Sequence, residues 1–445
     1  VNRDSRLIGQ LTSAPGIYIG PIFYYLLVPF FLLFNMDPVG IVVPITIFAL
    51  LTTLSYYFVF AKLFNKYVGF FASIIQAVSL FSIDFDRRNV PSTPTNLWTI
   101  WYFYTIISIS RGNYSVLPIL GILIGLIWHI HIALAPALLA VPAAMLVSRK
   151  LPRLIDIMWF LATLIITSLP LIIFEVRNGF SQTLSLIQNF LLSHPGGEGE
   201  WKLQMVLNMI GKNINSLFIS PQSLPASLQP FLLIILLLLF IPLFIKKILS
   251  IKEIIPQLVW ILGMVAFFSI SSTQISEYYF YNIQVIFIGL ISLIFYLLGK
   301  SSKKWQGVVA AVLIFIFLKN LYFFTTSYIY HKGYVERKAT ANYISKDAKG
   351  KGFPCVGINY ITSPGENVGF RYFFYLNNQH LVPPSNNVPV YSIVIPDEYA
   401  LKEVEVKYGH IGIITPKKIQ AKEVIDYHCS GGNSNLTDPM FGYVE

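Results

Sequence analysis

From residue 38 to residue 324, apolar side chains form long runs separated by short polar stretches. A helix needs about 20 apolar residues to cross a hydrocarbon core about 30 Å thick. The pattern therefore predicts about ten membrane-spanning helices. They lie near residues 39–60, 67–84, 97–110, 115–130, 132–147, 155–174, 229–245, 255–272, 281–299 and 306–324.

An earlier apolar run, residues 20–34, is too short for a full crossing and contains Pro21 and Pro29. Proline interrupts helical hydrogen bonding, so this run favours an interfacial or re-entrant helix over a span. This choice fixes the side of the membrane on which every later loop lies.

The charges of the loops test that choice, because Lys and Arg collect in short cytoplasmic loops. One side of the membrane receives 12 basic residues: Lys62, Lys66, Arg111, Arg149, Lys150, Arg153, Lys246, Lys247, Lys252, Lys300, Lys303 and Lys304. The other side receives five, although its loops are longer: Arg87, Arg88, Arg177, Lys202 and Lys212. We predict that the first side is cytoplasmic and that the loops at 85–96 and 175–228 are extracytoplasmic.

The pattern changes at about residue 325, which divides the chain into a membrane domain, residues 1–325, and a tail, residues 326–445. Strand-like runs in the tail (352–361, 388–395 and 410–415) alternate with helix-like stretches (334–345 and 397–408). This alternation predicts a small α/β domain, extracytoplasmic by the same parity. The fold class is thus a polytopic α-helical membrane protein with a small C-terminal α/β domain. An alternative is that the tail only caps the membrane part.

Composition supports the membrane class and narrows the function. The chain is 55% hydrophobic and 12% charged, against about 25% charged residues in soluble proteins. The net charge is +11. Most of it lies in the first 325 residues, which contain 20 Lys and Arg against 10 Asp and Glu, whereas the tail contains 12 against 11. The charge therefore reflects membrane topology, not nucleic-acid binding. The chain shows no Walker loop or GxGxxG motif, which argues against an ATP-driven pump.

Two cysteines, Cys355 and Cys429, both lie in the tail, and their spacing is not that of a metal site. Because an extracytoplasmic compartment permits oxidation, we predict a disulfide between them. Two separate thiols are the alternative.

Ionisable and aromatic residues gather at the predicted outer ends of the spans, not at their centres: Asp84, Asp86, Arg87, Arg88, His129, His131, Glu175, Arg177, Glu277, Tyr278 and Tyr279. A transporter tends to place such groups near the midplane. This distribution indicates a site at the outer membrane surface.

Each of these signals has a structural alternative. Arg87 and Arg88 could hold a lipid phosphate or anchor the chain at the headgroups. Asp84 and Asp86 have the DxD spacing that can hold a divalent cation, although that spacing is common. His131 could bind substrate or fill a helix end, and Glu175 could only pair with Arg177.

Five segments resemble the bacterial GT-C glycosyltransferases of the dolichyl-phosphate-mannose protein mannosyltransferase type, family 39. They are LIGQLTSAPGIYIGPIFYYLL at 7–27, DFDRRNVPSTP at 84–94, GLIWHIHIALAPALL at 125–139, PLIIFEVRNGF at 170–180 and ISEYYFYNIQVIF at 275–287. The resemblance covers residues 7 to about 325, in the order found in that family.

This resemblance implies an enzyme that moves a sugar from a polyprenyl-phosphate donor to a lipid, glycan or protein acceptor outside the plasma membrane. It also implies an acidic general base in the first outer loop, and cations that stabilise the leaving phosphate. Arg87 and Arg88 match the position of such cations.

We therefore predict a glycosyltransferase with Asp84, Asp86 and Glu175 as catalytic candidates. The predicted substrate-binding residues are Arg87, Arg88, His131, Arg177, Tyr278 and Tyr279. Residues 20–34 would guide the lipid. Since the family's acidic motif has no counterpart here, we expect the primary base, and one further span, upstream of Val1. The alternatives are a flippase for lipid-linked saccharides and a noncatalytic scaffold that presents the tail.

Overall fold

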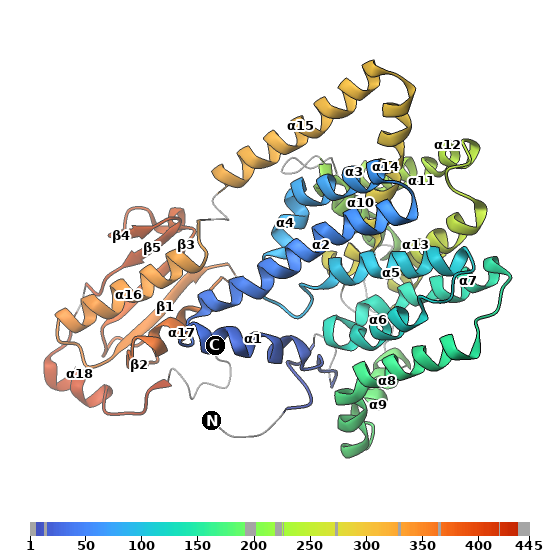
Figure 1. Cartoon of the computed structure of the whole chain (residues 1–445). Helices are drawn as coiled ribbons and strands as arrows, with labels where there is room; N and C mark the ends of the chain where they lie inside the picture. The colour runs from blue at the N-terminus through green and yellow to red at the C-terminus, as the bar shows by residue number, and fades with distance from the viewer. Residues whose placement is uncertain are drawn as a thin grey trace. The chain divides into compact units, whose positions relative to one another are not determined.

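The computed structural model describes residues 6–12, 16–191, 202–218, 225, 227–271, 275–327, 331–363, 366–417 and 419–434. The chain divides into two compact units, residues 1–321 and 322–445 (Figure 1). The first unit is helical and the second contains the sheet, so the predicted fold class is confirmed.

The first unit consists of α-helices and short 3₁₀ helices that coincide with the predicted apolar runs, and two further helices, residues 181–191 and 202–218, lie in the predicted loop 175–228. In chain order they are α1 (Ile22–Leu33), η1 (Pro38–Ile41), α2 (Val42–Leu63), α3 (Lys66–Val78), α4 (Leu80–Asp86), α5 (Thr95–Ser110), α6 (Leu117–Ile130), η2 (Ile132–Leu139), α7 (Ala140–Ser148), α8 (Leu154–Arg177), α9 (Ser181–Leu191), α10 (Lys202–Phe218), α11 (Gln229–Leu238), α12 (Phe240–Ile245), α13 (Ile251–Ile270), η3 (Glu277–Ile283), α14 (Gln284–Ser301) and α15 (Lys303–Thr326). Every predicted apolar run overlaps one helix or two consecutive helices.

Fewer of these helices are long enough to cross a membrane than the predicted ten. Within the described residues, five are long and apolar enough, or six if the bent pair α3 and α4 is one span. The others are short or interrupted. Helix α5 has 16 residues, about 24 Å at 1.5 Å per residue, and the segment 132–148 begins as a 3₁₀ helix that contains Pro136. Because the described residues contain five or six apolar helices long enough to span a membrane, together with shorter apolar helices, the chain is a multi-pass membrane protein. Helix α1, with 12 residues, is about 18 Å long, in keeping with a helix that does not cross.

Helices α3 and α4 meet at a bend of 68°. At the bend, the amide of Ser82 donates a hydrogen bond to the hydroxyl of Ser79 at 3.4 Å. The carbonyl of Val78 instead accepts a hydrogen bond from Nδ2 of Asn320 on α15, at 2.7 Å. A carbonyl that is partly shielded from water needs such a partner, so α15 supports the bend that directs α4.

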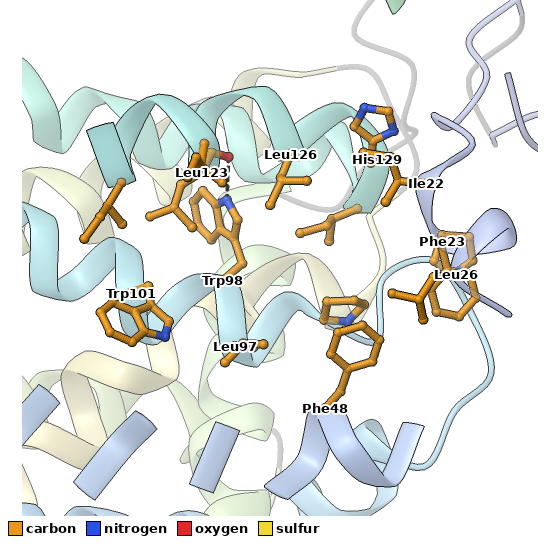
Figure 2. Close-up of a pocket in the computed structure, with 15 residues that line it drawn as sticks. Ile22, Phe23, Leu26, Phe48, Leu97, Trp98, Trp101, Leu123, Leu126 and His129 are labelled. Carbon is orange, nitrogen blue, oxygen red and sulfur yellow. Dashed lines mark hydrogen bonds between the residues drawn. The ribbon is translucent and has the colours of Figure 1, made fainter. Parts of the chain in front are cut away.

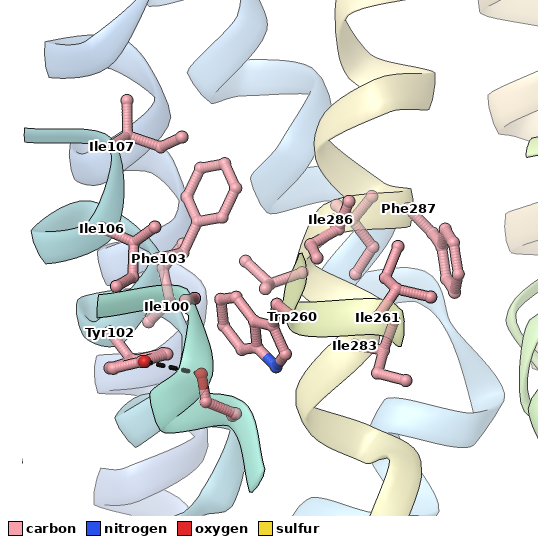
Figure 3. Packing of buried hydrophobic residues seen from close by; sticks show 14 of the residues in the cluster. Ile100, Tyr102, Phe103, Ile106, Ile107, Trp260, Ile261, Ile283, Ile286 and Phe287 are labelled. Carbon is pink, nitrogen blue, oxygen red and sulfur yellow. Dashed lines mark hydrogen bonds between the residues drawn. The ribbon is translucent and has the colours of Figure 1, made fainter. Parts of the chain in front are cut away.

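Small residues allow helices α6 and α8 to pack closely. A Cβ atom on Gly121 would lie 2.3 Å from Oγ1 of Thr163, and one on Gly125 would lie 1.9 Å from Oγ1 of Thr167. Glycines four residues apart commonly bring membrane helices into such contact. The rest of the interior is aromatic and aliphatic, with Trp260 of α13 packed between α5 and α14 (Figure 3). Its indole N–H donates to Oδ1 of Asn282 at 2.7 Å.

The second unit is a small α/β domain, as predicted, with a five-stranded sheet of order β2-β1-β3-β5-β4. Strands β1, β2 and β3 are parallel, and β5 runs antiparallel to β3 and β4. Its elements are α16 (Tyr334–Gly350), β1 (Val356–Thr362), α17 (Phe370–Leu376), β2 (Leu381–Val382), β3 (Val390–Ile395), η5 (Asp397–Ala400), β4 (Val406–Tyr408), β5 (Ile411–Ile414) and α18 (Lys422–His428).

The predicted disulfide between Cys355 and Cys429 is present, with Cα atoms 5.5 Å apart. It attaches the C-terminal end of α18 to the residue before β1. The alternative of two free thiols is therefore wrong.

Candidate functional site

Helix α4 presents its acidic residues to different surroundings. Asp84 accepts from a guanidinium nitrogen of Arg88 at 2.6 Å, one turn further along the chain. Asp86 is buried, and its Oδ1 accepts from Nδ2 of Asn96 at 2.8 Å. Residues i and i+2 on a helix point about 200° apart, so the two carboxylates do not converge on one ion.

The residues after α4 form a tight turn. The hydroxyl of Thr93 donates to the carbonyl of Arg88 and accepts from the amide of Val90 at 3.3 Å. Burial lowers the pKa of Arg88, but neighbouring groups, Tyr281 and Asp84 foremost, raise it by more. Arg88 therefore remains a cation at the start of a well-defined loop.

His131 lies between α6 and η2, where hydrogen bonds fix its tautomer. Its Nδ1 accepts from the amide of Ala133 at 3.1 Å, so the ring proton lies on Nε2. That nitrogen is 3.2 Å from the hydroxyl of Tyr278. The ring of His131 also packs against the ring of Tyr279, with centroids 5.0 Å apart. His131 is thus a neutral, oriented donor beside two tyrosines.

The chain before α1 folds back on itself. Residues 9–12 and 16–19 pair as an antiparallel ribbon, which we call the N-terminal ribbon. The amide of Gly9 donates to the carbonyl of Ile19 at 2.6 Å, and that of Ile19 donates to the carbonyl of Gln10 at 2.9 Å. The ribbon brings polar side chains near the loop after α4.

These three elements, with η3, enclose a polar pocket of about 250 Å³. It unites three of the predicted residues, Arg88, His131 and Tyr278. The ribbon contributes Gln10, Leu11, Thr12 and Ile19, and the region from α4 onward contributes Phe85, Val90, Pro91 and Ser92.

An apolar cavity of about 360 Å³ lies next to this pocket, and Pro91 lines both. Side chains of α1, α2, α5 and α6 form its walls, among them Phe23, Phe48 and Trp98 (Figure 2). The indole N–H of Trp98 is satisfied by the carbonyl of Leu123 at 2.7 Å, so it leaves no free donor in the cavity. The polar pocket and the apolar cavity therefore meet at Pro91.

The remaining predicted residues lie outside the set that lines the polar pocket. Glu175 is buried and accepts from the amides of Gln182 and Thr183, at 3.1 and 3.0 Å. It caps the first turn of α9, a structural use of a carboxylate at a helix N-terminus. Arg87 and Arg177 are exposed.

No group of three or more His, Cys, Asp or Glu residues in the described part of the chain could hold a metal ion. A second ion pair joins Lys212 of α10 to Glu277 of η3. Next to it, Nδ2 of Asn213 donates to the carbonyl of Glu277 at 2.8 Å. The sequence analysis named Glu277 but not its partners, because α10 is amphipathic and lies in residues 175–228, which were predicted to form a loop.

The fold defines a class, a multi-pass membrane protein, and its candidate site consists of two adjoining compartments. Residues 18–174 match the model of a family described as dolichyl-phosphate-mannose-protein mannosyltransferase. The match includes α1, α4, Arg88 and His131, and it confirms over this stretch the resemblance predicted from the sequence motifs. Over these residues the chain is similar to that family.

Two further comparisons were made. The chain is similar to the crystal structure of ArnT from Cupriavidus metallidurans bound to undecaprenyl phosphate, at 12% identity and a TM-score of 0.46 over 94% of this chain and 95% of the other. The search of curated proteins gives no match.

Proposed function

We propose that this protein transfers a sugar from a polyprenyl-phosphate donor to an acceptor at the outer face of the cytoplasmic membrane. One observation carries the proposal: the polar pocket that contains Arg88 shares Pro91 with an apolar cavity. A lipid phosphate has the same two parts, a charged head joined directly to an apolar chain.

The two compartments suit the two parts of such a donor. The isoprenoid next to the phosphate would lie among Phe23, Phe48 and Trp98, where burial of apolar surface gains about 25 cal/mol per Å². The phosphate would lie against Arg88, whose planar guanidinium binds phosphate oxygens in pairs. The family description, which includes a dolichyl-phosphate sugar, supports this donor class.

The chemistry is a displacement at the anomeric carbon. The acceptor oxygen forms a bond to that carbon, while the bond from the carbon to the phosphate oxygen breaks and its electron pair stays on the phosphate. Arg88 stabilises the charge that develops there, and Nε2 of His131 donates to the sugar or the phosphate. The acceptor hydroxyl gives its proton to a carboxylate. Of the three predicted carboxylates, Asp84 is the one that contacts a residue of the pocket, its ion-pair partner Arg88, whereas Asp86 and Glu175 bind groups outside the pocket.

The test is a transfer assay with radiolabelled polyprenyl-phosphate sugars, using the full-length protein in native membranes. We expect Arg88→Ala to lower turnover about 10²- to 10³-fold, as removal of a comparable electrostatic group does. Arg88→Lys should recover part of the lost turnover, because lysine restores the positive charge but not the planar guanidinium that binds two phosphate oxygens. The exposed cation Lys252, at the start of α13, offers a control for abundance in Lys252→Ala.

Normal turnover in Arg88→Ala would refute the phosphate role. Labelled lipid that crosses the membrane without cleavage of the sugar–phosphate bond would refute the transferase and support a flippase. Asp84→Asn tests the carboxylate: a loss that persists at high pH is expected of a base, whereas an unchanged rate would exclude it.

A further inference from the structure

Helix α9 leaves one apolar side exposed although it is packed on its opposite side. Phe180, Leu184 and Ile187 are 55%, 52% and 48% exposed. At about 100° per residue, Leu184 and Ile187 lie about 60° apart around the helix, and Phe180, just before α9, belongs to the same turn because its carbonyl accepts from the amide of Leu184 at 2.9 Å. Together they form an apolar stripe, which is unusual on a surface that faces water.

The opposite side of α9 holds the N-terminal ribbon. Gln182 points about 200° from Phe180, is buried, and its Oε1 accepts from the amide of Tyr18 at 2.7 Å. Ser185 also faces the ribbon, since a Cβ on Gly16 would lie 2.5 Å from its hydroxyl oxygen. The helix therefore contacts the wall of the polar pocket with one face and exposes the apolar stripe on the other.

The surface next to the stripe indicates what covers it. Helix α8 is a candidate span, and none of its most apolar 18-residue window is buried within the protein. Its last exposed apolar residue, Val176, is followed by a short turn through Gly179 and Phe180, both with positive φ. The apolar surface thus continues from a span onto α9.

We infer that α9 is an interfacial helix, whose apolar stripe rests on the bilayer surface and whose opposite face holds the N-terminal ribbon against the polar pocket. Amphipathic helices bury such a stripe at the boundary between headgroups and acyl chains. Glu175 caps the helix at the end of α8, so the depth of the span sets the position of α9. The lipid surface in this way fixes one wall of the site, whichever reaction the site catalyses.

Spin labelling can test the lipid contact without an activity assay. Both native cysteines are joined in the disulfide, so a nitroxide attaches only to an introduced cysteine. In vesicles of dioleoylphosphatidylcholine, labels at Leu184→Cys and Ile187→Cys should collide with oxygen more often than with a water-soluble nickel chelate. The control Lys349→Cys, at an exposed polar position of α16, should show the opposite preference.

Nickel access at Leu184→Cys and Ile187→Cys equal to that at Lys349→Cys would overturn the inference. Low access to both reagents with dipolar broadening would also overturn it, because that result means contact with a second copy. The contact between α9 and the N-terminal ribbon is tested separately, by the mobility of a spin label at Leu11→Cys. Gln182→Leu should increase this mobility and Gln188→Leu should not; equal mobility would remove the ribbon from the inference.

Discussion

Gly20 is the position where the smallest possible change should disturb the site. It lies at the start of α1, and its amide donates to the carbonyl of Trp128 at 3.0 Å. A Cβ atom there would lie 2.1 Å from Nδ1 and 2.5 Å from Cε1 of His129. Since the ring is 2% exposed and its Nε2 is 3.1 Å from the carbonyl of Thr167, it has little freedom to move.

Gly20→Ala should therefore destabilise the protein by about 1–3 kcal/mol, the usual cost of overpacking. If α1 shifts instead of the ring, the hydrogen bond to Trp128 is lost, which costs about 1 kcal/mol more. Because Phe23 and Leu26 of α1 line the apolar cavity, the shift should also raise the KM for the donor. A change of 1.4 kcal/mol in donor binding corresponds to about tenfold.

The assays are thermal unfolding of the purified protein and initial rates against donor concentration. Gly307→Ala is the matched control, since a Cβ on that glycine meets no atom within 4 Å. The double variant Gly20→Ala, His129→Ala should lose less stability than the sum of the single changes, because removal of the ring provides the space. If Gly20→Ala matches Gly307→Ala in both stability and KM, the steric argument is wrong.

Three other changes test separate features. Asn320→Leu leaves the partly shielded carbonyl of Val78 unpaired, so it should cost about 1–3 kcal/mol and lower turnover through α4; unchanged turnover at reduced stability would limit its role to folding. Ala in place of Cys355 and Cys429 should destabilise the tail by about 2–5 kcal/mol, seen as a lower Tm than that of the oxidised protein. Burial raises the pKa of Asp347, but Lys351 and the hydroxyl of Tyr391 lower it by more. The carboxylate therefore contributes stability above the unfolded-state pKa of about 3.9, and this contribution is lost as pH falls through the lower folded-state value. Asp347→Asn should remove that pH dependence from the unfolding of the tail, and the exposed Asp426→Asn should retain it.

Hydrophobic runs predict the helices well because burial in lipid or in the protein interior selects the same side chains. They do not show how the helices bend. Nothing in residues 67–84 requires a 68° turn, and its support comes from Asn320, more than 200 residues away. The division of the chain near residue 325 could be predicted from the sequence because the long apolar runs end there.

The candidate site was predicted in part. Arg88, His131 and Tyr278 lie together because charged and polar groups gather where spans end, which the sequence shows directly. The use of Glu175 as a cap was not apparent, since α9 turns back only after two residues with positive φ. The N-terminal ribbon also escaped notice, because its strands are too short to give an alternating pattern.

The turn from Arg88 to Pro91 fixes the distance between the guanidinium of Arg88 and the start of the apolar cavity. Thr93 holds it with bonds to Arg88 and Val90, and Thr93 itself is buried. In the proposed donor complex, the boundary between charged and apolar space would therefore stay at Pro91. A donor with one phosphate would place its sugar beside His131, whereas a pyrophosphate carrier would carry the sugar past it. Selection between these two classes of carrier would then follow from the rigidity of a single loop, with no residue devoted to the second phosphate.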